Sequence, residues 1–506
     1  MERNRSEVGS LAGSAPVPFL PVAGPRGLPL LGNLLAFGRD PLAFLELLRD
    51  DFGDVVTWSL GPMRIIFLSH PEHIAELLGA DERRYETPDV GWSFRRLVGD
   101  SVIRSQGADW RRKRSLVQPT VRPRQVRAYA ATMVDCAVAL ADCWQDGERI
   151  DVLREMTQLT QRIVVRTLFG NDVGDQARVL GDAMMVAGRE IGAELRGVGL
   201  FLPPRARTPA RRRLLEAVAT VDTEIDRLVR ARQASQGVGN DRDDLMSRLL
   251  AARDEKGRPL TPTEVRDEAV TLWVGGHETT STALTWSWYL LSASPHARGR
   301  LTAELDRVLA GRPPTMDDYE QLTWTQQIVK EALRLYPPGW MVPPRVAHDG
   351  AVLGGSPVPA GTMVWCSQWV THRDPRWFPD PTAFRPERWD TNPQQSVPQH
   401  AWFPFGGGQR SCLGARFALV EAALVLATLA QRFHVDVDPG EDGSHLIILT
   451  AGQATRVTRP PRARTGQQDQ QASSCVSIRP TASPAPSNAE AMSPGHTSAE
   501  PLAALQ

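Results

Sequence analysis

The 506-residue sequence is poor in cysteine, and its cysteines are not paired. The five are scattered without any Cys-x-x-Cys spacing, at Cys136, Cys143, Cys366, Cys412 and Cys475. This pattern provides neither a disulfide framework nor a zinc site, and it suits a reducing cytoplasm. Net charge is also absent, because 58 Lys and Arg residues balance 58 Asp and Glu residues. No global electric field therefore favours binding to nucleic acid or to a membrane surface.

The N-terminal segment lacks a long apolar run. Residues 1–20 are polar and interrupted by proline and glycine, so we expect no membrane anchor and no signal peptide there. Residues 460–506 are rich in Pro, Ser, Ala and Gln without apolar periodicity, which is typical of disorder. We therefore expect a cytoplasmic protein with disordered ends, 1–20 and 460–506, and one domain over residues 21–459.

The sequence between these ends predicts a mainly α fold with a minor β region. Apolar residues make up 42% of the chain, which is enough for a substantial core. The periodicity is mainly helical from His70 to about Ala310. β-rich runs at 55–60 and 64–68 predict a hairpin, and a further β-rich region at 352–371 predicts a small sheet.

A long central helix is predicted from the capping box Thr261-Pro262-Thr263-Glu264. It extends to about Ala293, where Ser294-Pro295 begins another helix. About 30 residues at ~1.5 Å each give a rod of ~45 Å, which is long enough to cross the domain.

Inside this helix lies the segment Gly275-Gly276-His277-Glu278-Thr279-Thr280. Each glycine in a helix interior costs about 1 kcal/mol relative to alanine. We expect the Thr279 hydroxyl to bond to the Gly275 carbonyl and to open the helix at this point. Such a notch, beside an acid and a hydroxyl, suits a diatomic ligand and a proton relay. The alternative for a bare Gly-Gly pair is a helix–helix packing contact.

A glycine-rich loop with one cysteine, Phe405-Gly-Gly-Gly-Gln-Arg-Ser-Cys-Leu-Gly414, precedes another apolar-periodic segment. Cys412 is predicted to lie just ahead of that helix, whose N-terminal N–H groups and dipole favour a thiolate. Arg410 is a rigid cationic fork suited to a carboxylate. A thiolate in this loop can ligate a metal, and a buried or incidental thiol is the alternative.

Two further pairs of residues have helical spacing. Trp110 and Arg114 are four residues apart, on one helix face that also carries the basic turn 111–113. Glu331 and Arg334 are three residues apart, which allows the two charges to meet. Taken alone, both pairs are common features of solvated helix surfaces.

The pattern Phe-x-x-Gly-x-Arg-x-Cys-x-Gly around Cys412, with the other motifs, resembles the cytochrome P-450 family. The resemblance extends over about residues 21–459 and implies a haem b cofactor with Cys412 as the ligand of the iron. It implies that dioxygen is activated reductively and that an apolar substrate is hydroxylated or epoxidised. Electrons would come from NAD(P)H through a separate ferredoxin reductase and ferredoxin, and the protein is expected to be a monomer.

The resemblance also assigns roles to individual residues. Glu278 and Thr279 match the oxygen-activation motif and would deliver protons. Glu331, Arg334 and Arg388 match a structural Glu–Arg–Arg triad. The basic turn 111–113, which comprises Arg111, Arg112 and Lys113, would form a docking surface for an acidic electron donor. The cofactor-binding residues would be Trp110, Arg114, Arg345, Phe405, Arg410, Cys412 and Gly414.

The expected substrate site is apolar. Its lining is expected to comprise Trp92, Phe94, Thr271, Val274, Gly275, Trp340, Met341 and Val342. The segments 21–33 and 275–280 are similar to those of actinobacterial terpene hydroxylases such as the pentalenene oxygenase group, so a terpenoid of secondary metabolism is the first expectation. A fatty acid, polyketide or steroid hydroxylase and a peroxide-driven peroxygenase are the alternatives. A haem gas sensor or carrier would not need the acid–alcohol pair, which therefore favours an enzyme.

Overall fold

The computed structural model describes residues 21–88, 91–170, 174–196, 203, 205–235, 244–390, 397–437 and 454–458. Both ends for which disorder was predicted, residues 1–20 and 460–506, lie outside the described residues.

The described part contains α-helices, short 3₁₀ segments and short strands. The helices are α1 (Leu34–Arg39), α2 (Pro41–Leu47), α3 (Pro71–Gly79), α4 (Trp92–Val98), α5 (Gly107–Val117), α6 (Pro123–Cys143), α7 (Val152–Phe169), α8 (Gly174–Arg196), α9 (Pro209–Ser235), α10 (Leu245–Ala251), α11 (Pro262–Ser292), α12 (Pro295–Leu309), α13 (Thr323–Leu335), α14 (Gln368–Thr371) and α15 (Ala415–Ala430). The strands are β1 (Val22–Ala23), β2 (Val55–Leu60), β3 (Met63–Leu68), β4 (Tyr85–Glu86), β5 (Arg149–Asp151), β6 (Arg345–Ala347), β7 (Val352–Leu353), β8 (Ser356–Pro357), β9 (Met363–Cys366), β10 (His434–Val437) and β11 (Ala454–Thr458). The predicted mainly α fold with a minor β region is confirmed.

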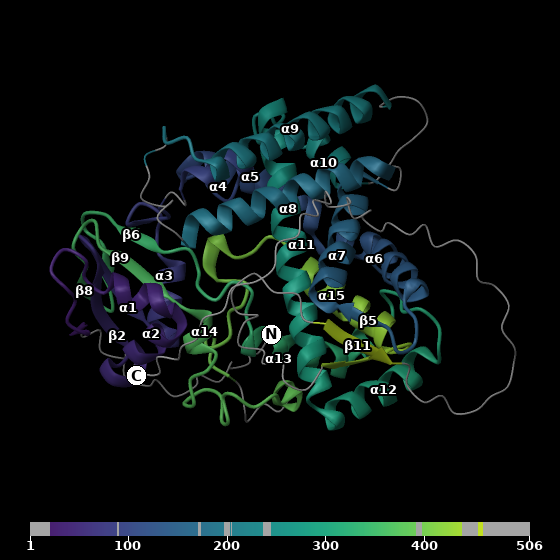
Figure 1. The fold of residues 1–506 in the computed structure, drawn as a ribbon. Coiled ribbons are helices and arrows are strands. Elements are labelled where there is room, and N and C mark those ends of the chain that lie inside the picture. The colour runs from purple at the N-terminus through teal and green to yellow at the C-terminus, as the bar shows by residue number, and fades with distance from the viewer. Residues whose placement is uncertain are drawn as a thin grey trace, which may run out of the picture. The chain divides into compact units, whose positions relative to one another are not determined.

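Helix α11 runs through the middle of the helical region, next to α7 and α15 (Figure 1). Its start is fixed by the predicted capping box, since the Thr261 side chain accepts from Glu264 N and the Glu264 side chain accepts from Thr261 N. The helix ends at Ser292, and α12 begins at Pro295 after the Ser294 cap. The predicted bounds of α11 and the predicted start of α12 are therefore confirmed.

The main hydrophobic core joins α6, α7, α11 and α15. Met133, Ile163, Trp273 and Leu424, one from each helix, are fully buried there. Burying a large apolar side chain stabilises the fold by about 1.5–3 kcal/mol. This packing holds the middle of α11 against the helix that follows the cysteine loop.

A six-stranded sheet has the order β1-β2-β3-β9-β6-β4. Strands β2 and β3 form the predicted antiparallel hairpin, and β9 joins β3 in parallel. Side chains along β3 alternate between two apolar clusters, with Ile66 and Leu68 in one and Ile65 and Phe67 in the other. This alternation is the two-residue period of a strand that is covered on both faces.

One part of the β prediction is wrong. The region 352–371 does not form a sheet of its own, because only β7 and β8 pair with each other while β9 joins the larger sheet. Residues 368–371 form α14 instead of a strand, since the side chain of Ser367 caps a helix there.

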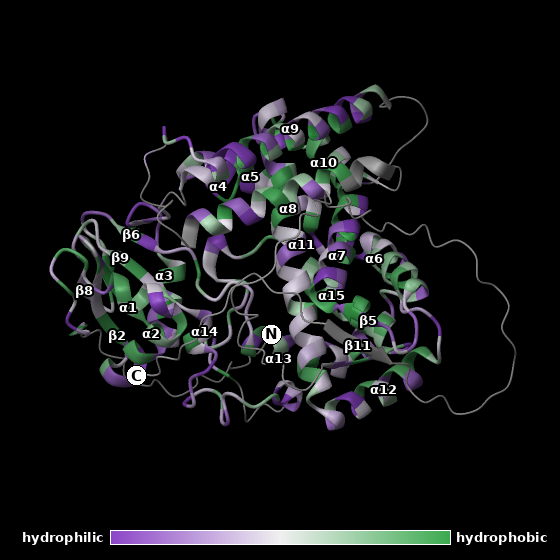
Figure 2. Ribbon diagram, viewed as in Figure 1, coloured by the Kyte–Doolittle hydropathy of each residue, from purple (hydrophilic) through white to green (hydrophobic). Residues whose placement is uncertain are grey.

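Helix α5 is mostly purple in Figure 2 because of its run of arginine and lysine. Among the described residues, no helix is both long and apolar enough to cross a bilayer.

Candidate functional site

The cysteine loop turns tightly in front of α15. Gly406 and Gly408 adopt positive φ angles of 68° and 64°, which favour glycine. A Cβ at Gly408 would collide with the Leu78 carbonyl oxygen, so the loop packs directly on the end of α3. The Cys412 N–H donates to Phe405 O at 2.9 Å, which closes the loop on itself. Cys412 is exposed to the space beside the loop, although the surrounding protein still desolvates its thiol.

The thiol of Cys412 differs from the sequence prediction in one respect. The Gly414 N–H and the charge of Arg114 favour the thiolate, as expected from the helix N-terminus, but burial outweighs them and raises the pKa of Cys412. The helix N-terminus alone therefore does not produce the thiolate. A bound metal cation deprotonates a coordinating thiol outright.

Three guanidinium groups from distant parts of the chain gather beside this loop. Arg114 of α5 donates from Nη1 to Ser411 O at 2.8 Å. Arg345 of β6 is 9% exposed and donates from Nη1 to Thr87 Oγ1 and Pro343 O. Arg410 of the loop lies over the Trp110 ring at 4.6 Å from its centroid. We call Arg114, Arg345 and Arg410 the arginine cluster.

The arginine cluster carries more positive charge than its surroundings neutralise. Burial lowers the pKa of Arg114, Arg345 and Arg410, and the charge of Arg410 lowers the pKa of the other two further. Several N–H groups of these side chains have no hydrogen-bond acceptor among the described residues, such as Nε and Nη2 of Arg114 and of Arg345. Buried guanidinium groups require counterions. A ligand with carboxylate groups fits this site.

Gly275 and Gly276 of α11 have different surroundings. A Cβ at Gly276 would lie 2.8 Å from Val164 of α7, so this glycine permits close helix packing. A Cβ at Gly275 would meet nothing within 4 Å, and Gly275 and Thr279 are exposed although their helix runs through the core. Helix–helix packing therefore explains Gly276, whereas the expected notch lies at Gly275.

The Thr279 hydroxyl donates to Gly275 O at 2.8 Å, as predicted. Residues 275–280 nevertheless remain helical without interruption, so the predicted opening of the helix is not observed. The carboxylate of Glu278 is half-buried and makes no hydrogen bond or ion pair with any residue that the structure describes. Helix α11 thus presents the exposed hydroxyl of Thr279 next to Glu278, whose carboxylate no described residue binds.

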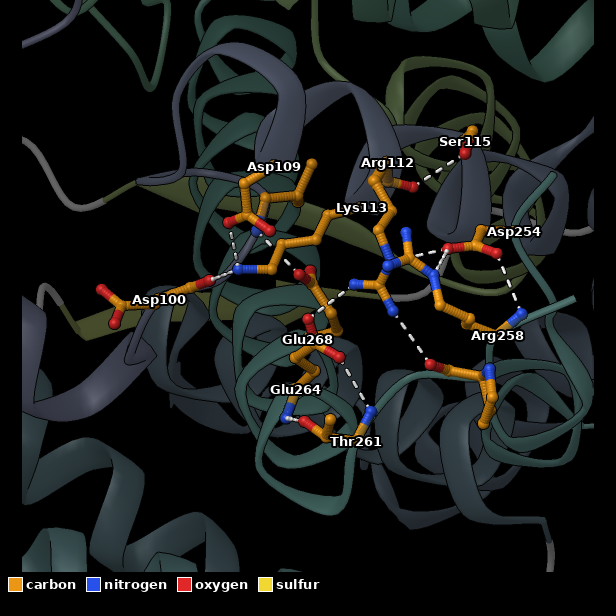
Figure 3. A network of polar contacts seen from close by, with 12 residues as sticks. Asp100, Asp109, Arg112, Lys113, Ser115, Asp254, Arg258, Thr261, Glu264 and Glu268 are labelled. Carbon is orange, nitrogen blue, oxygen red and sulfur yellow. Dashed lines mark hydrogen bonds and ion pairs between the residues drawn. The ribbon is translucent and has the colours of Figure 1, made fainter. Parts of the chain in front are cut away.

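Two residues of the basic turn of α5, Arg112 and Lys113, face inward, whereas Arg111 is exposed. Arg112 forms ion pairs with Asp254 and Glu264 at 3.0 and 2.7 Å (Figure 3). Lys113 is buried and bonds to the Asp109 carboxylate and the Asp100 carbonyl. The expectation of a docking surface over 111–113 is therefore wrong for Arg112 and Lys113, whose charges are neutralised internally.

Glu331, Arg334 and Arg388 lie together. The Glu331 carboxylate accepts from Arg334 at 2.7 and 2.9 Å and from Arg388 Nε at 3.1 Å. Arg334 also donates to the carbonyl oxygens of His372, Pro381 and Ala383. This network ties α13 to the segment that leads to the cysteine loop.

The residues expected to line a substrate site fall into two groups. Phe94 and Val274 pack against the main core, and Trp92 stacks beneath Arg211 at 4.7 Å. The Thr271 hydroxyl donates to Ser101 Oγ at 2.6 Å. In the second group, Trp340 and Met341 pack against an apolar cluster of the sheet, while Val342 lies 3.7 Å from where a Cβ at Gly406 of the cysteine loop would be.

One buried acid near this site escaped the sequence analysis. Both carboxyl oxygens of Glu421 in α15 are buried without a hydrogen-bond partner among the described residues. Burial raises the pKa of Glu421 well above its usual value. The nearby Thr280 hydroxyl favours the charged form, but it donates to Gly276 O at 3.1 Å. A lone glutamate in the otherwise apolar stretch 417–427 was the signal for it.

An exposed cysteine in a tight loop, three cations with one carboxylate among them and an open helix face together match a flat metal complex with carboxylate groups. The family model described as Cytochrome P450 matches residues 22–458. The chain belongs to the cytochrome P450 family. Members hold haem iron through a cysteine thiolate, and the donor set of this P450 fits that group.

Curated relatives cover most of this P450. Cyclooctatin synthase and cyclooctat-9-en-7-ol 5-monooxygenase from Streptomyces melanosporofaciens are each 37% identical to it, over 86% and 87% of this chain and 95% of each relative. Pentalenene oxygenase from Streptomyces avermitilis is 32% identical over 89% of this chain and 99% of the relative. Family and relatives make this chain a P450 monooxygenase.

Proposed function

We propose that this P450 hydroxylates or epoxidises an apolar terpenoid of secondary metabolism. One observation carries the chemistry: the exposed Gly275–Thr279 face belongs to α11, and the exposed Cys412 lies just before α15, a helix that packs against α11. The terpenoid substrate is supported by the relatives, whose printed names include a pentalenene oxygenase and a cyclooctat-9-en-7-ol monooxygenase.

The residues present define how the haem would be held. Cys412 Sγ would ligate the iron, and the arginine cluster would bind the two haem carboxylates with its unused N–H groups. Phe405 and Gly414 would flank the sulfur, since they bracket the loop that carries it. When bound, the haem supplies reductive activation of dioxygen, and a thiolate ligand favours cleavage of the O–O bond.

Protons would reach the site through α11. Glu278 would exchange protons with solvent, because no described residue engages its carboxylate. Thr279 Oγ1, which now donates to Gly275 O at 2.8 Å, would turn to pass a proton onward. The absence of a side chain at Gly275 leaves room beside this hydroxyl.

The substrate would be bound mainly by apolar contacts. Val274 and Phe94 offer apolar surface on one side, and Val342 on the other, next to the cysteine loop. Thr271 is engaged with Ser101, so it would contribute its methyl group rather than a hydrogen bond. Such a lining positions a hydrocarbon by shape and excludes water from it.

Electrons would come from NAD(P)H through ferredoxin reductase and ferredoxin in the cytoplasm. Because Arg112 and Lys113 face inward, we assign the ferredoxin contact to Arg111 and Arg416, whose side chains are 62% and 43% exposed. Arg111 is one turn before Arg114, which bonds to Ser411 O. Arg416 lies in the first turn of α15, four residues after Cys412.

The test uses purified holoprotein with a surrogate ferredoxin, ferredoxin reductase and NADPH. Pentalenene and cyclooctat-9-en-7-ol are titrated alongside lauric acid and a steroid, and the spin-state shift of the Soret band reports binding. We expect at least one terpenoid to bind more tightly than either comparator and to yield a product that contains one oxygen atom from ¹⁸O₂. Preferential binding and turnover of the fatty acid or the steroid would refute the terpenoid assignment. Equal turnover with peroxide alone would refute the role of the electron donors.

A further inference from the structure

One carboxylate, Glu82, belongs to the surroundings of the arginine cluster and has no role in the function described above. It follows α3 in the chain, and its side chain is 16% exposed. Its Oε1 accepts from Arg410 Nε at 2.9 Å and lies 2.8 Å from Arg410 Nη2. Its Oε2 is buried, lies 3.5 Å from Arg111 Nη1, and accepts no hydrogen bond from a described residue.

Glu82 decides how Arg410 is oriented. The carboxylate takes the Nε and Nη2 edge of the guanidinium, while Ser105 O and Gln106 Oε1 also accept from Nη2. The Trp110 ring supports the guanidinium plane from one side. Nη1 of Arg410 is left without an acceptor among the described residues. A charged fork fixed along one edge presents its remaining donors in one direction.

Glu82 also decides how much charge the cluster carries. Its carboxylate lies 2.8 Å from Arg410 Nη2 and accepts from Arg410 Nε at 2.9 Å, so its charge acts directly on the cluster. Arg114, Arg345 and Arg410 bring three positive charges, and Glu82 offsets one of them. Arg111, whose Nη1 is 3.5 Å from Glu82, is 62% exposed, so solvent screens its charge. The two that remain equal the number of carboxylates that haem b carries.

We propose that Glu82 is a positioning residue for the haem: it holds Arg410 with Nη1 free, and it leaves the arginine cluster with two charges for two haem carboxylates. The proposal rests on the assignment of the cluster to those carboxylates under the proposed function. The simpler alternative is that Glu82 pins the segment after α3 to the cysteine loop and affects stability alone.

Two substitutions separate orientation from charge. Glu82→Gln keeps an oxygen that accepts from Arg410 but removes the negative charge, whereas Glu82→Ala removes both. Glu86→Gln is the matched control, because it removes one carboxylate nearby that pairs with His348 at 3.4 Å instead of with the cluster. For each holoprotein we measure the ferric/ferrous reduction potential, the rate of haem transfer to apomyoglobin and the thermal midpoint.

Reduction adds a negative charge to the haem, so removing a nearby carboxylate favours the ferrous form. We expect Glu82→Gln to raise the reduction potential above those of the parent and Glu86→Gln, with haem loss within about twofold of the parent. We expect Glu82→Ala to lose haem about tenfold faster or more, since a charge-assisted hydrogen bond no longer orients Arg410. A stability role alone would lower the thermal midpoint without moving the potential.

An unchanged potential in Glu82→Gln overturns the charge matching. Equal rates of haem loss for Glu82→Ala and Glu82→Gln overturn the positioning of Arg410. If the alanine variant does not fold, the reduction potential of the glutamine variant still decides whether Glu82 sets the charge of the cluster. A thiolate-type CO spectrum in the parent and in every variant keeps the haem site itself intact, so failure of this proposal is distinct from failure of the site assignment.

Discussion

The Glu331 network allows a quantitative prediction for Glu331→Gln. Glu331 and Arg334 have fully buried side chains, and the Glu331 carboxylate also accepts from Arg385 N and Trp389 Nε1 at 3.1 and 3.0 Å. An amide in its place removes the negative charge and leaves the Arg334 cation buried. Breaking a buried pair in this way costs about 3–5 kcal/mol, whereas whole domains are stable by about 5–15 kcal/mol. We therefore expect loss of a large part of the free energy of unfolding.

Urea denaturation of the holoprotein, followed by far-ultraviolet circular dichroism and by Soret absorbance, measures this effect. We expect the two signals to shift to lower urea together, because the network joins α13 to the segment before the cysteine loop. Glu320→Gln is the control, since its carboxylate is 79% exposed and 3.6 Å from Arg416, and such pairs contribute about 0–1 kcal/mol. A Glu331→Gln protein within about 1 kcal/mol of the parent would refute the stabilising role.

Three further predictions concern chemistry, pH and haem retention. Thr279→Ala should lower product formed per NADPH and raise peroxide while haem content stays near the parent value. The control Thr282→Ala, which removes a hydroxyl that bonds to Glu278 O, should leave product per NADPH at the parent value. Unchanged product per NADPH in Thr279→Ala would contradict the proton role. Burial raises the pKa of Glu268 to about 8 from 4.5, so the folded state keeps a proton that the unfolded state releases and stability falls as pH rises between these values. Glu268→Gln should flatten urea midpoints measured from about pH 5 to pH 8, and an unaltered slope would count against this. Arg114→Ala should weaken haem retention; normal retention with poor ferredoxin binding would place Arg114 on a docking face.

Features fixed by neighbouring residues could be predicted from the sequence. The start of α11 depends on a capping box of four consecutive residues, and the Thr279–Gly275 bond spans one helical turn. Glu331 and Arg334 meet because residues three apart in a helix share a face. In each case the physical cause lies within a few residues of its effect.

Features fixed by distant residues could not be predicted in the same way. The basic turn of α5 was expected to face solvent, but Arg112 finds Asp254 and Glu264 more than a hundred residues away. The pKa of Cys412 depends on burial by the whole fold, which outweighs the helix N-terminus. Glu82 and Glu421 belong to no motif, and their surroundings exist only after the chain has folded.

The CO difference spectrum of the reduced protein tests most directly whether Cys412 ligates the haem iron. We expect the parent to show the red-shifted Soret band of a thiolate-ligated CO complex, Cys412→His to bind haem without that band, and Cys412→Ala to bind haem poorly. An unchanged CO spectrum in either variant would show that another residue ligates the iron, and it would contradict the site described here.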